Sequence, residues 1–236
     1  MGAASCLRNS MLELRVLFED NHCLVVEKPA GVLIAGDRTG DVSLLDHAKN
    51  YIKQKYQKPG DVYLGLVHRL DRPVSGVTLF ARTSKAASRL SEQFRNDSTE
   101  KIYNAWVLGR PVPRVATLTD WLLKDEARNV VSVVSPRTSG AQDARLDFKV
   151  ITEAAGRSLL EVRLHTGRSH QIRVQLSSRG WPIIGDTKYR APASRHQGAI
   201  ALHARSLTFE HPTLHEQITV QSPLPTEWRQ WFGVPG

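Results

Sequence analysis

The run from His68 to Gly76, HRLDRPVSG, joins a charged segment to residues that interrupt regular structure. Asp71 lies between two arginines, Arg69 and Arg72, so nearby positive charge should keep its carboxylate ionised. An ionised carboxylate can act as a nucleophile or as a base. From these residues alone, a structural ion pair that fixes the loop is an equally good interpretation.

A second charged run, HTGRSHQIR, begins at His165. It predicts a strand end, a turn and then a helix for which Ser169 could be the N-cap. Arg168 and Arg173 bring two guanidinium groups to this turn, which would suit a phosphate or a carboxylate. His165 and His170 do not have the spacing of zinc ligands on a helix, so no metal is expected. A solvated basic turn is the alternative interpretation.

Tyr103, in the run KIY, falls within a predicted strand. A tyrosine on a strand usually fills a core. If it faced a carboxylate, its ring could instead stack on a base and its hydroxyl could form a hydrogen bond. The run IIGDTKY, which begins at Ile183, predicts a tight turn and indicates little by itself. Lone histidines such as His203 are more often structural than catalytic.

The composition narrows the class of protein. The chain has 236 residues and a formal net charge of +9, and its arginines lie beside the motifs instead of in a tail. This balance favours a nucleic-acid partner over a basic protein without a polyanionic one. The two cysteines, Cys6 and Cys23, form no disulfide framework or zinc spacing, which fits a reducing compartment. No apolar run approaches the ~20 residues of a membrane span.

The periodicity of apolar residues predicts more strands than helices. Many of the strands follow one another without a helix between them, which favours an α+β fold with a largely antiparallel sheet. We expect one domain over residues 12–236 after a loose leader over residues 1–11. The expected helices are 43–56, 84–96 (capped by Ser84), 170–178 and a terminal turn at 225–231. The expected strands are 12–18, 23–27, 62–67, 77–82, 101–108, 117–123, 129–134, 146–153, 158–164, 199–209 and 217–221.

The motifs together resemble one known family. HRLD…SG, KIY, TGRSHQIR, PIIGDTKY and ALHA…LTFEHP occur in the order found in the RluA family of pseudouridine synthases, and EDNHCLVVEKPAGVL at the front also fits. The match runs from about residue 14 to residue 223. The resemblance implies a single α+β catalytic domain, with a mostly antiparallel mixed sheet, flanking helices and a central active-site cleft.

The resemblance also implies roles for individual residues. Asp71 matches the catalytic aspartate of the family. Tyr103 matches the active-site tyrosine that packs on the target base. Arg173 matches the arginine that pairs with the catalytic aspartate. The implied partner of Asp71 is therefore a residue about a hundred positions away, and not one of the adjacent arginines.

Five further residues are placed with the substrate. Ile172 matches an apolar residue that lines the uracil pocket. Arg69 matches an arginine that can enter the RNA stack where the uridine leaves. Arg168 is assigned to site architecture or to the RNA backbone. His68 and Arg72, which belong to the same HRLDRPVSG run as Asp71, complete the expected substrate-binding set.

The sequence departs from the family pattern at three positions near these residues. Val74 stands where many members have threonine, and Gln175 and Trp181 stand where histidine is common. These departures bear on substrate preference more than on chemistry. The family often carries an N-terminal S4 RNA-binding domain, which we expect this chain to lack because it begins almost at the catalytic domain.

The implied reaction converts a uridine in rRNA or tRNA to pseudouridine, and it needs no metal and no cofactor. The N-glycosidic bond breaks, the uracil rotates, and carbon 5 bonds to the sugar. Asp71 could attack C1′, attack the uracil ring or abstract a sugar proton, and the residues do not choose among these routes.

We expect a cytoplasmic monomer whose partner is an RNA stem-loop, with no membrane contact. The alternatives are a non-catalytic RNA-binding protein on the same fold, and an unrelated hydrolase for which no nucleophile motif is present.

Overall fold

The structure is a computed structural model that describes residues 13–37, 39–196 and 198–235. The leader expected over residues 1–11 lies outside the described residues. Within them the fold is α+β, as expected, and its strands join one mixed sheet in the order β1-β2-β4-β10-β5-β9-β8-β6-β7, with β11 beside β10 and β3 beside β4. Only β4 and β10 run parallel among the pairs of this described sheet. None of the described helices is both long enough and apolar enough to cross a membrane.

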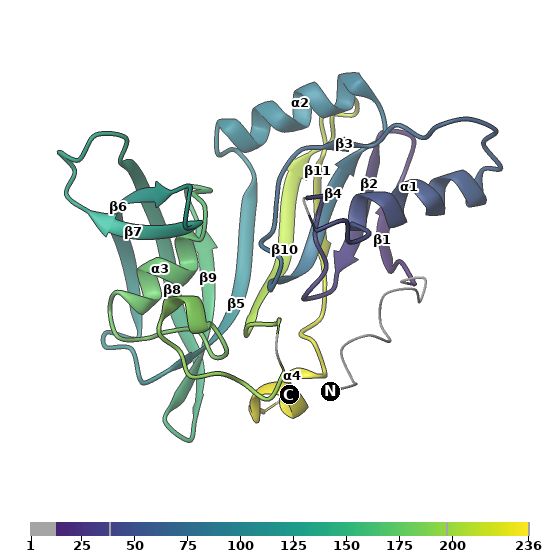
Figure 1. Cartoon of the computed structure of the whole chain (residues 1–236). Helices are drawn as coiled ribbons and strands as arrows, with labels where there is room; N and C mark the ends of the chain where they lie inside the picture. The colour runs from purple at the N-terminus through teal and green to yellow at the C-terminus, as the bar shows by residue number, and fades with distance from the viewer. Residues whose placement is uncertain (1–12, 38, 197, 236) are drawn as a thin grey trace.

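Figure 1 shows β5 and β10 in the middle of the molecule, with β6 to β9 and α3 on one side and β1, β2, β4 and α1 on the other. The helices are α1 Leu44–Lys55, α2 Ser84–Arg95, α3 Gln171–Ser177 and α4 Trp228–Phe232, with a 3-10 turn, η1, at Thr187–Tyr189. The strands are β1 Val16–Glu19, β2 Cys23–Lys28, β3 Gly65–Leu66, β4 Ser75–Ala81, β5 Glu100–Leu108, β6 Val115–Asp125, β7 Val130–Val134, β8 Gln142–Ala154, β9 Arg157–Leu164, β10 Leu202–Glu210 and β11 Gln217–Gln221.

The helix predicted at 43–56 is confirmed, and its ends follow from its sequence. Ser43 and Asp46 form a capping box at the start of α1, and Leu44, Ala48 and Ile52 are buried at helical spacing. The predicted cap of the next helix is wrong by one residue. Thr83 has the extended backbone of an N-cap and its hydroxyl accepts the Ala86 N–H, while Ser84 is already helical.

The strand predicted at 62–67 is mostly wrong, because only Gly65–Leu66 forms ladder pairs with β4. Val62 and Leu64 are instead buried against the apolar cluster that contains the inner face of α1. Val62 and Leu64 alternate with exposed residues because both contact the cluster that includes α1. Over so few residues this apolar spacing cannot be distinguished from that of a strand. The cap predicted for α3 is also wrong, since His170 and not Ser169 occupies the N-cap position.

Gly76 explains why the HRLDRPVSG run ends in Ser-Gly. The parallel contact between β4 and β10 pairs Ser75 with His203 and Gly76 with Ala204. Gly76 has φ +121°, and a Cβ there would lie 2.3 Å from the Ala204 carbonyl oxygen. Only glycine fits such a close backbone approach. The contact fixes the C-terminal end of the loop that carries Asp71.

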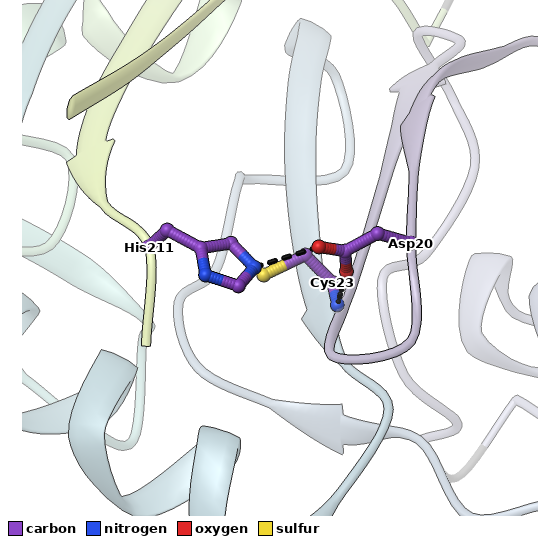
Figure 2. A group of neighbouring side chains, drawn as sticks. All are labelled: Asp20, Cys23 and His211. Carbon is purple, nitrogen blue, oxygen red and sulfur yellow. Dashed lines mark hydrogen bonds and ion pairs between the residues drawn. The ribbon is translucent and has the colours of Figure 1, made fainter. Parts of the chain in front are cut away.

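A trio of the partly exposed Asp20 and the buried Cys23 and His211 ties the β1–β2 turn to the β10–β11 turn (Figure 2). The Asp20 carboxylate accepts the backbone N–H groups of His22 and Cys23 at 2.7 Å and lies 2.6 Å from His211 Nε2. His211 Nδ1 accepts the Leu214 N–H at 3.0 Å, so Nε2 must carry the proton that it donates to Asp20. A metal ligand nitrogen needs a free lone pair, so these hydrogen bonds favour a structural clamp over a metal site.

We expect Asp20→Asn to lower the free energy of unfolding by about 2 kcal/mol at pH 7, because the charged hydrogen bond to His211 is lost. Burial acts to raise the pKa of Asp20, but hydrogen bonds from His22, Cys23 and His211 outweigh it and lower that pKa. The clamp therefore stabilises the fold above the ordinary pKa of aspartate and loses its effect as pH falls through the lowered value.

Urea denaturation of wild type and Asp20→Asn at pH 7 and near pH 3 checks this prediction. The difference between them should shrink at the lower pH. Asp61→Asn, at an exposed position, is the matched control and should leave the free energy of unfolding within about 0.5 kcal/mol at both pH values. An equal deficit of Asp20→Asn at both pH values would contradict the argument.

Candidate active site

The loop between β3 and β4 and the turn before α3 meet at a cleft beside β5. Each of these segments comes from a different part of the chain, and together they bring most of the predicted site residues to one place. The predicted residues that line this cleft are Arg69, Asp71, Tyr103, Arg168, Ile172 and Arg173. His68 and Arg72 border a wider groove that includes most of the residues lining this cleft, Asp71 among them.

Asp71 and Arg173 form an ion pair in the cleft. Arg173 Nη1 lies 2.8 Å from Asp71 Oδ2, and the two side chains are 5% and 30% exposed respectively. Burial acts to lower the pKa of Arg173, but the hydrogen bonds and charges of Asp186 and Asp71 raise it, so the guanidinium stays charged. The pair leaves the carboxylate partly open to the cleft, as a reacting group must be.

Asp186 holds the other edge of the same guanidinium. Its two carboxylate oxygens lie 2.7 Å from Arg173 Nε and 2.8 Å from Arg173 Nη2, and Asp186 is 1% exposed. A two-bonded arginine–carboxylate pair fixes both the position and the plane of the guanidinium. Sequence reasoning missed this residue. The available signal was a carboxylate two residues after the apolar pair Ile183–Ile184, within the run IIGDTKY.

Tyr103 reaches the cleft from β5, where its neighbours are Ala204 on β10 and Val162 on β9. Burial and the charge of Asp71 both raise the pKa of Tyr103, so its hydroxyl stays protonated. Ile172, 4% exposed, adds an apolar wall to the same cleft. The site thus combines one partly exposed carboxylate, one aromatic ring and one apolar surface.

Two further predicted residues, His68 and Arg72, make contacts within the protein. Burial lowers the pKa of His68 to about 4, and the neutral ring accepts the Leu79 N–H at 2.9 Å and stacks on Phe94. These contacts favour a structural role for His68. Arg72 is 2.8 Å from Asp41 and donates to the Gly31 carbonyl, so it fixes the loop from outside.

Of the two remaining arginines, Arg168 is hydrogen-bonded to the protein and, among the residues that the structure describes, Arg69 is not. Arg168 Nε donates to the Asp143 carbonyl at 2.9 Å, which suits a role in site architecture. Arg69 is exposed and, within the described residues, forms no ion pair or hydrogen bond with a protein group. Its guanidinium is therefore available to a ligand in the cleft.

Lys28 fixes the loop that carries Asp71 by hydrogen bonds to backbone carbonyls, a role that sequence reasoning did not identify. Its ammonium is fully buried and donates to the carbonyls of Pro29, Val32 and Arg72 at 2.9, 2.7 and 3.0 Å. Burial lowers the pKa of Lys28 to about 7, although the charge of Asp71 acts against this. The three carbonyls join residues 28–32 to the residue that follows Asp71. The only sequence signal was a lysine before Pro-Ala-Gly at a strand end.

The three departures from the family pattern have separate surroundings. Val74 is buried and lines the cleft. Gln175, a residue of α3, donates to the Asp120 carboxylate at 2.7 Å. Trp181 packs edge to face on Phe148. Among these three departures, only Val74 lines the cleft.

Comparisons with known proteins agree on one family. A family model described as RNA pseudouridylate synthase matches residues 22–178. The chain is 35% identical over 220 residues to a Bacillus subtilis protein named as an uncharacterized RNA pseudouridine synthase, YhcT, covering 92% of this chain and 70% of that one. It is 33% identical to the tRNA pseudouridine synthase C of Haemophilus influenzae, covering 92% and 95%, and 32% identical to the ribosomal large subunit pseudouridine synthase D of Zymomonas mobilis, covering 94% and 72%.

A solved structure shows the same fold. Human RNA pseudouridylate synthase domain containing 4 superposes with a TM-score of 0.75 at 26% identity, over 90% of this chain and 89% of that one. The similarity therefore covers nearly all of the chain in both sequence and structure.

Proposed function

This chain belongs to the RNA pseudouridylate synthase family, and we propose that it converts specific uridines of rRNA or tRNA to pseudouridine with Asp71 as the catalytic carboxylate. The enzyme is an isomerase that acts on RNA. The observation that supports the role of Asp71 is its 2.8 Å ion pair with Arg173, in a cleft shared with Tyr103. The pair places this carboxylate in a cleft that Tyr103 and Ile172 also line.

The reaction rearranges bonds within one nucleotide. The N-glycosidic bond breaks, the uracil rotates, carbon 5 bonds to C1′ of the sugar, and the proton on carbon 5 moves to the ring nitrogen released from the sugar. Asp71 can begin this by attack on C1′, by attack on the ring or by removal of a sugar proton. Each route requires an ionised carboxylate that a bound base shields from water, and the ion pair with Arg173 fixes the position of Asp71 in the cleft.

Extruding the target base requires compensation, because unstacking costs a few kcal/mol. The exposed Arg69 can fill the gap left in the RNA stack. Tyr103 offers a ring face and Ile172 an apolar surface to the extruded uracil. These three contacts provide the binding energy that offsets extrusion, while the chemistry falls to Asp71.

The names of two relatives support ribosomal RNA and tRNA as the proposed classes of substrate. The Zymomonas relative is named for ribosomal RNA and the Haemophilus relative for tRNA, so both are candidate substrates. We propose a compact stem-loop, recognised by its shape, as the substrate. The non-catalytic alternative is disfavoured because Asp71, Tyr103 and Arg173 meet in one cleft. We further propose that the enzyme works as a monomer in the cytoplasm, where the free thiol of Cys23 would stay reduced.

Chemical mapping of pseudouridine tests the proposal directly. Purified protein is incubated with unmodified rRNA fragments and with tRNA transcripts, and each uridine is probed before and after. We expect new pseudouridine at one or a few positions in one of these classes. If folded protein produced none in either class, the proposed substrates would be wrong.

RNA affinity should fall steeply with salt, because basic side chains of the wider groove would contact phosphates. The groove is lined by Arg69, Lys101, Lys124, Arg168 and Lys188. With about four phosphate contacts, affinity should fall roughly 100-fold between 50 and 200 mM salt. Filter binding across this range measures the slope.

Matched variants locate the effect. Lys188→Gln, in the groove, should reduce the salt slope by about one contact. Lys85→Gln, on an exposed face of α2, is the control and should leave the slope unchanged. A salt-independent affinity, or the same change in both variants, would contradict a phosphate-binding groove.

A further inference from the structure

His170 has an unusual backbone position at the start of α3. It is the N-cap residue with φ 51° and ψ 18°, in the left-handed region, yet its side chain makes no capping hydrogen bond. Such backbone strain in a non-glycine residue concentrates at functional sites. The conformation sends the imidazole into the wall of the cleft, where the side chain is 7% exposed. The backbone therefore serves the placement of this ring and not the helix end.

The ring bridges Tyr189 and Asp71. Nδ1 lies 2.7 Å from the Tyr189 hydroxyl, and Nε2 lies 3.7 Å from Asp71 Oδ2. The Tyr189 hydroxyl also accepts the Val131 N–H at 2.9 Å. Tyr189 and His170 meet edge to face at 5.7 Å between ring centres. This places a buried hydroxyl, an imidazole and the reactive carboxylate in one line of contacts.

These contacts fix which nitrogen carries the proton. Burial raises the pKa of Tyr189, so its hydroxyl keeps a proton, and with Val131 as its donor it can give that proton to His170 Nδ1. Nε2 then carries N–H and faces the carboxylate. The opposite tautomer would set a nitrogen lone pair against carboxylate lone pairs, which is repulsive.

The imidazole stays neutral in this setting. Burial lowers the pKa of His170, and it outweighs the opposing charge of Asp71. Among the other charged groups around the ring, Arg173 and Lys188 lower that pKa and Asp186 raises it. A neutral imidazole with one N–H is a donor to Asp71 that brings no further charge to the site.

We propose that His170 is a positioning residue that donates its Nε2–H to Asp71 Oδ2 when RNA occupies the cleft. The present 3.7 Å is too long for a hydrogen bond, and catalytic hydrogen bonds often shorten in the substrate complex. Arg173 already bonds the same oxygen, and the described residues donate no hydrogen bond to Oδ1. Both donors thus hold Oδ2 and leave Oδ1 for the reaction. This inference rests on the proposed function.

Two substitutions separate this role from a purely structural one. The amide nitrogen of glutamine can reach the position of Nε2, so His170→Gln keeps a donor for Asp71. Asparagine is too short to reach it, but it tolerates the left-handed backbone better than glutamine does. The two roles therefore predict opposite rankings: the donor role favours His170→Gln, and the backbone role favours His170→Asn.

Single-turnover rates, RNA dissociation constants and melting temperatures are measured for both variants. We expect His170→Asn to lower the rate about 10- to 30-fold, and His170→Gln to stay within about fivefold of wild type. RNA affinity should stay within about threefold for both, and His170→Gln should melt no higher than His170→Asn. Equal rates in the two variants, a faster His170→Asn, or a loss confined to RNA affinity would overturn the proposal.

Tyr189→Phe supplies an independent measurement. Without the hydroxyl, the proton of His170 is no longer fixed on Nε2, so this variant should also lower the rate. Adding it to His170→Asn should produce no further loss, because the donor is already absent. Multiplicative losses in the double variant would overturn the proposal that Tyr189 acts through His170. Inactive wild type on every RNA would instead contradict the proposed function, so the two failures are distinguishable.

Discussion

Replacing Asp71 with asparagine is expected to lower pseudouridine formation by at least about 1,000-fold, the scale seen when an essential catalytic group is removed. Asparagine has nearly the same shape but neither the negative charge nor the basicity of the carboxylate. All three routes open to Asp71 require that charge. Single-turnover assays on the mapped substrate RNA measure the rate.

RNA binding should survive the same change within about threefold, because the phosphate contacts lie along the wider groove. The fold should survive as well, since Arg173 keeps its two hydrogen bonds to Asp186. Asp41→Asn is the matched control: it neutralises an exposed carboxylate that pairs with Arg72 beside the same loop, and it should stay within about twofold of wild-type rate. Identical pseudouridine maps from wild type and Asp71→Asn would show that Asp71 is not catalytic.

Arg173→Ala is expected to lower the rate at least about 100-fold while changing RNA affinity little, because electrostatic support of a reacting group acts on the chemical step. It should also lower the free energy of unfolding by about 3 kcal/mol, since Asp186 would be a buried charge without its partner. Activity and urea denaturation are therefore measured on the same preparation.

Arg173→Lys separates the two effects. Lysine restores a positive charge near Asp186 and recovers much of the stability, but one ammonium cannot reproduce the guanidinium that bonds Asp186 twice and Asp71 once. We expect this variant to be folded and still at least about tenfold slow. Equal losses in rate and RNA affinity in either variant would count against a role of Arg173 in catalysis.

The parts of the site that the sequence predicted are those that carry a motif. Asp71, Tyr103 and Arg173 were placed together by the order of HRLD, KIY and TGRSHQIR, and the structure has them in one cleft. Local reasoning about charge alone suggested the neighbouring Arg72 as an ion-pair partner equally well. Arg72 points instead to Asp41, because adjacent residues in a loop direct their side chains to different sides.

The supporting residues could not be predicted, because their function depends on contacts between distant segments. Lys28 meets the carbonyl of Arg72, 44 residues away, and Asp186 meets Arg173, 13 residues away. A lysine before proline or an aspartate in a turn has many other uses. His170 was identified only as a residue with the wrong spacing for zinc, since neither its left-handed backbone nor Tyr189 is visible in a linear pattern.

The continuous sheet has a mechanical consequence. Asp71 precedes β4, Tyr103 lies on β5, and β10 is hydrogen-bonded to both strands, so two adjoining ladders connect β4 to β5 through β10. Such ladders resist rotation of one half against the other, unlike two lobes joined by a hinge. The protein then behaves as a stiff template, and the deformation needed to bring a uridine to Asp71 falls on the nucleic acid. Bulged or loop uridines, which bend at little energetic expense, should therefore be modified faster than the same uridine in a paired stem.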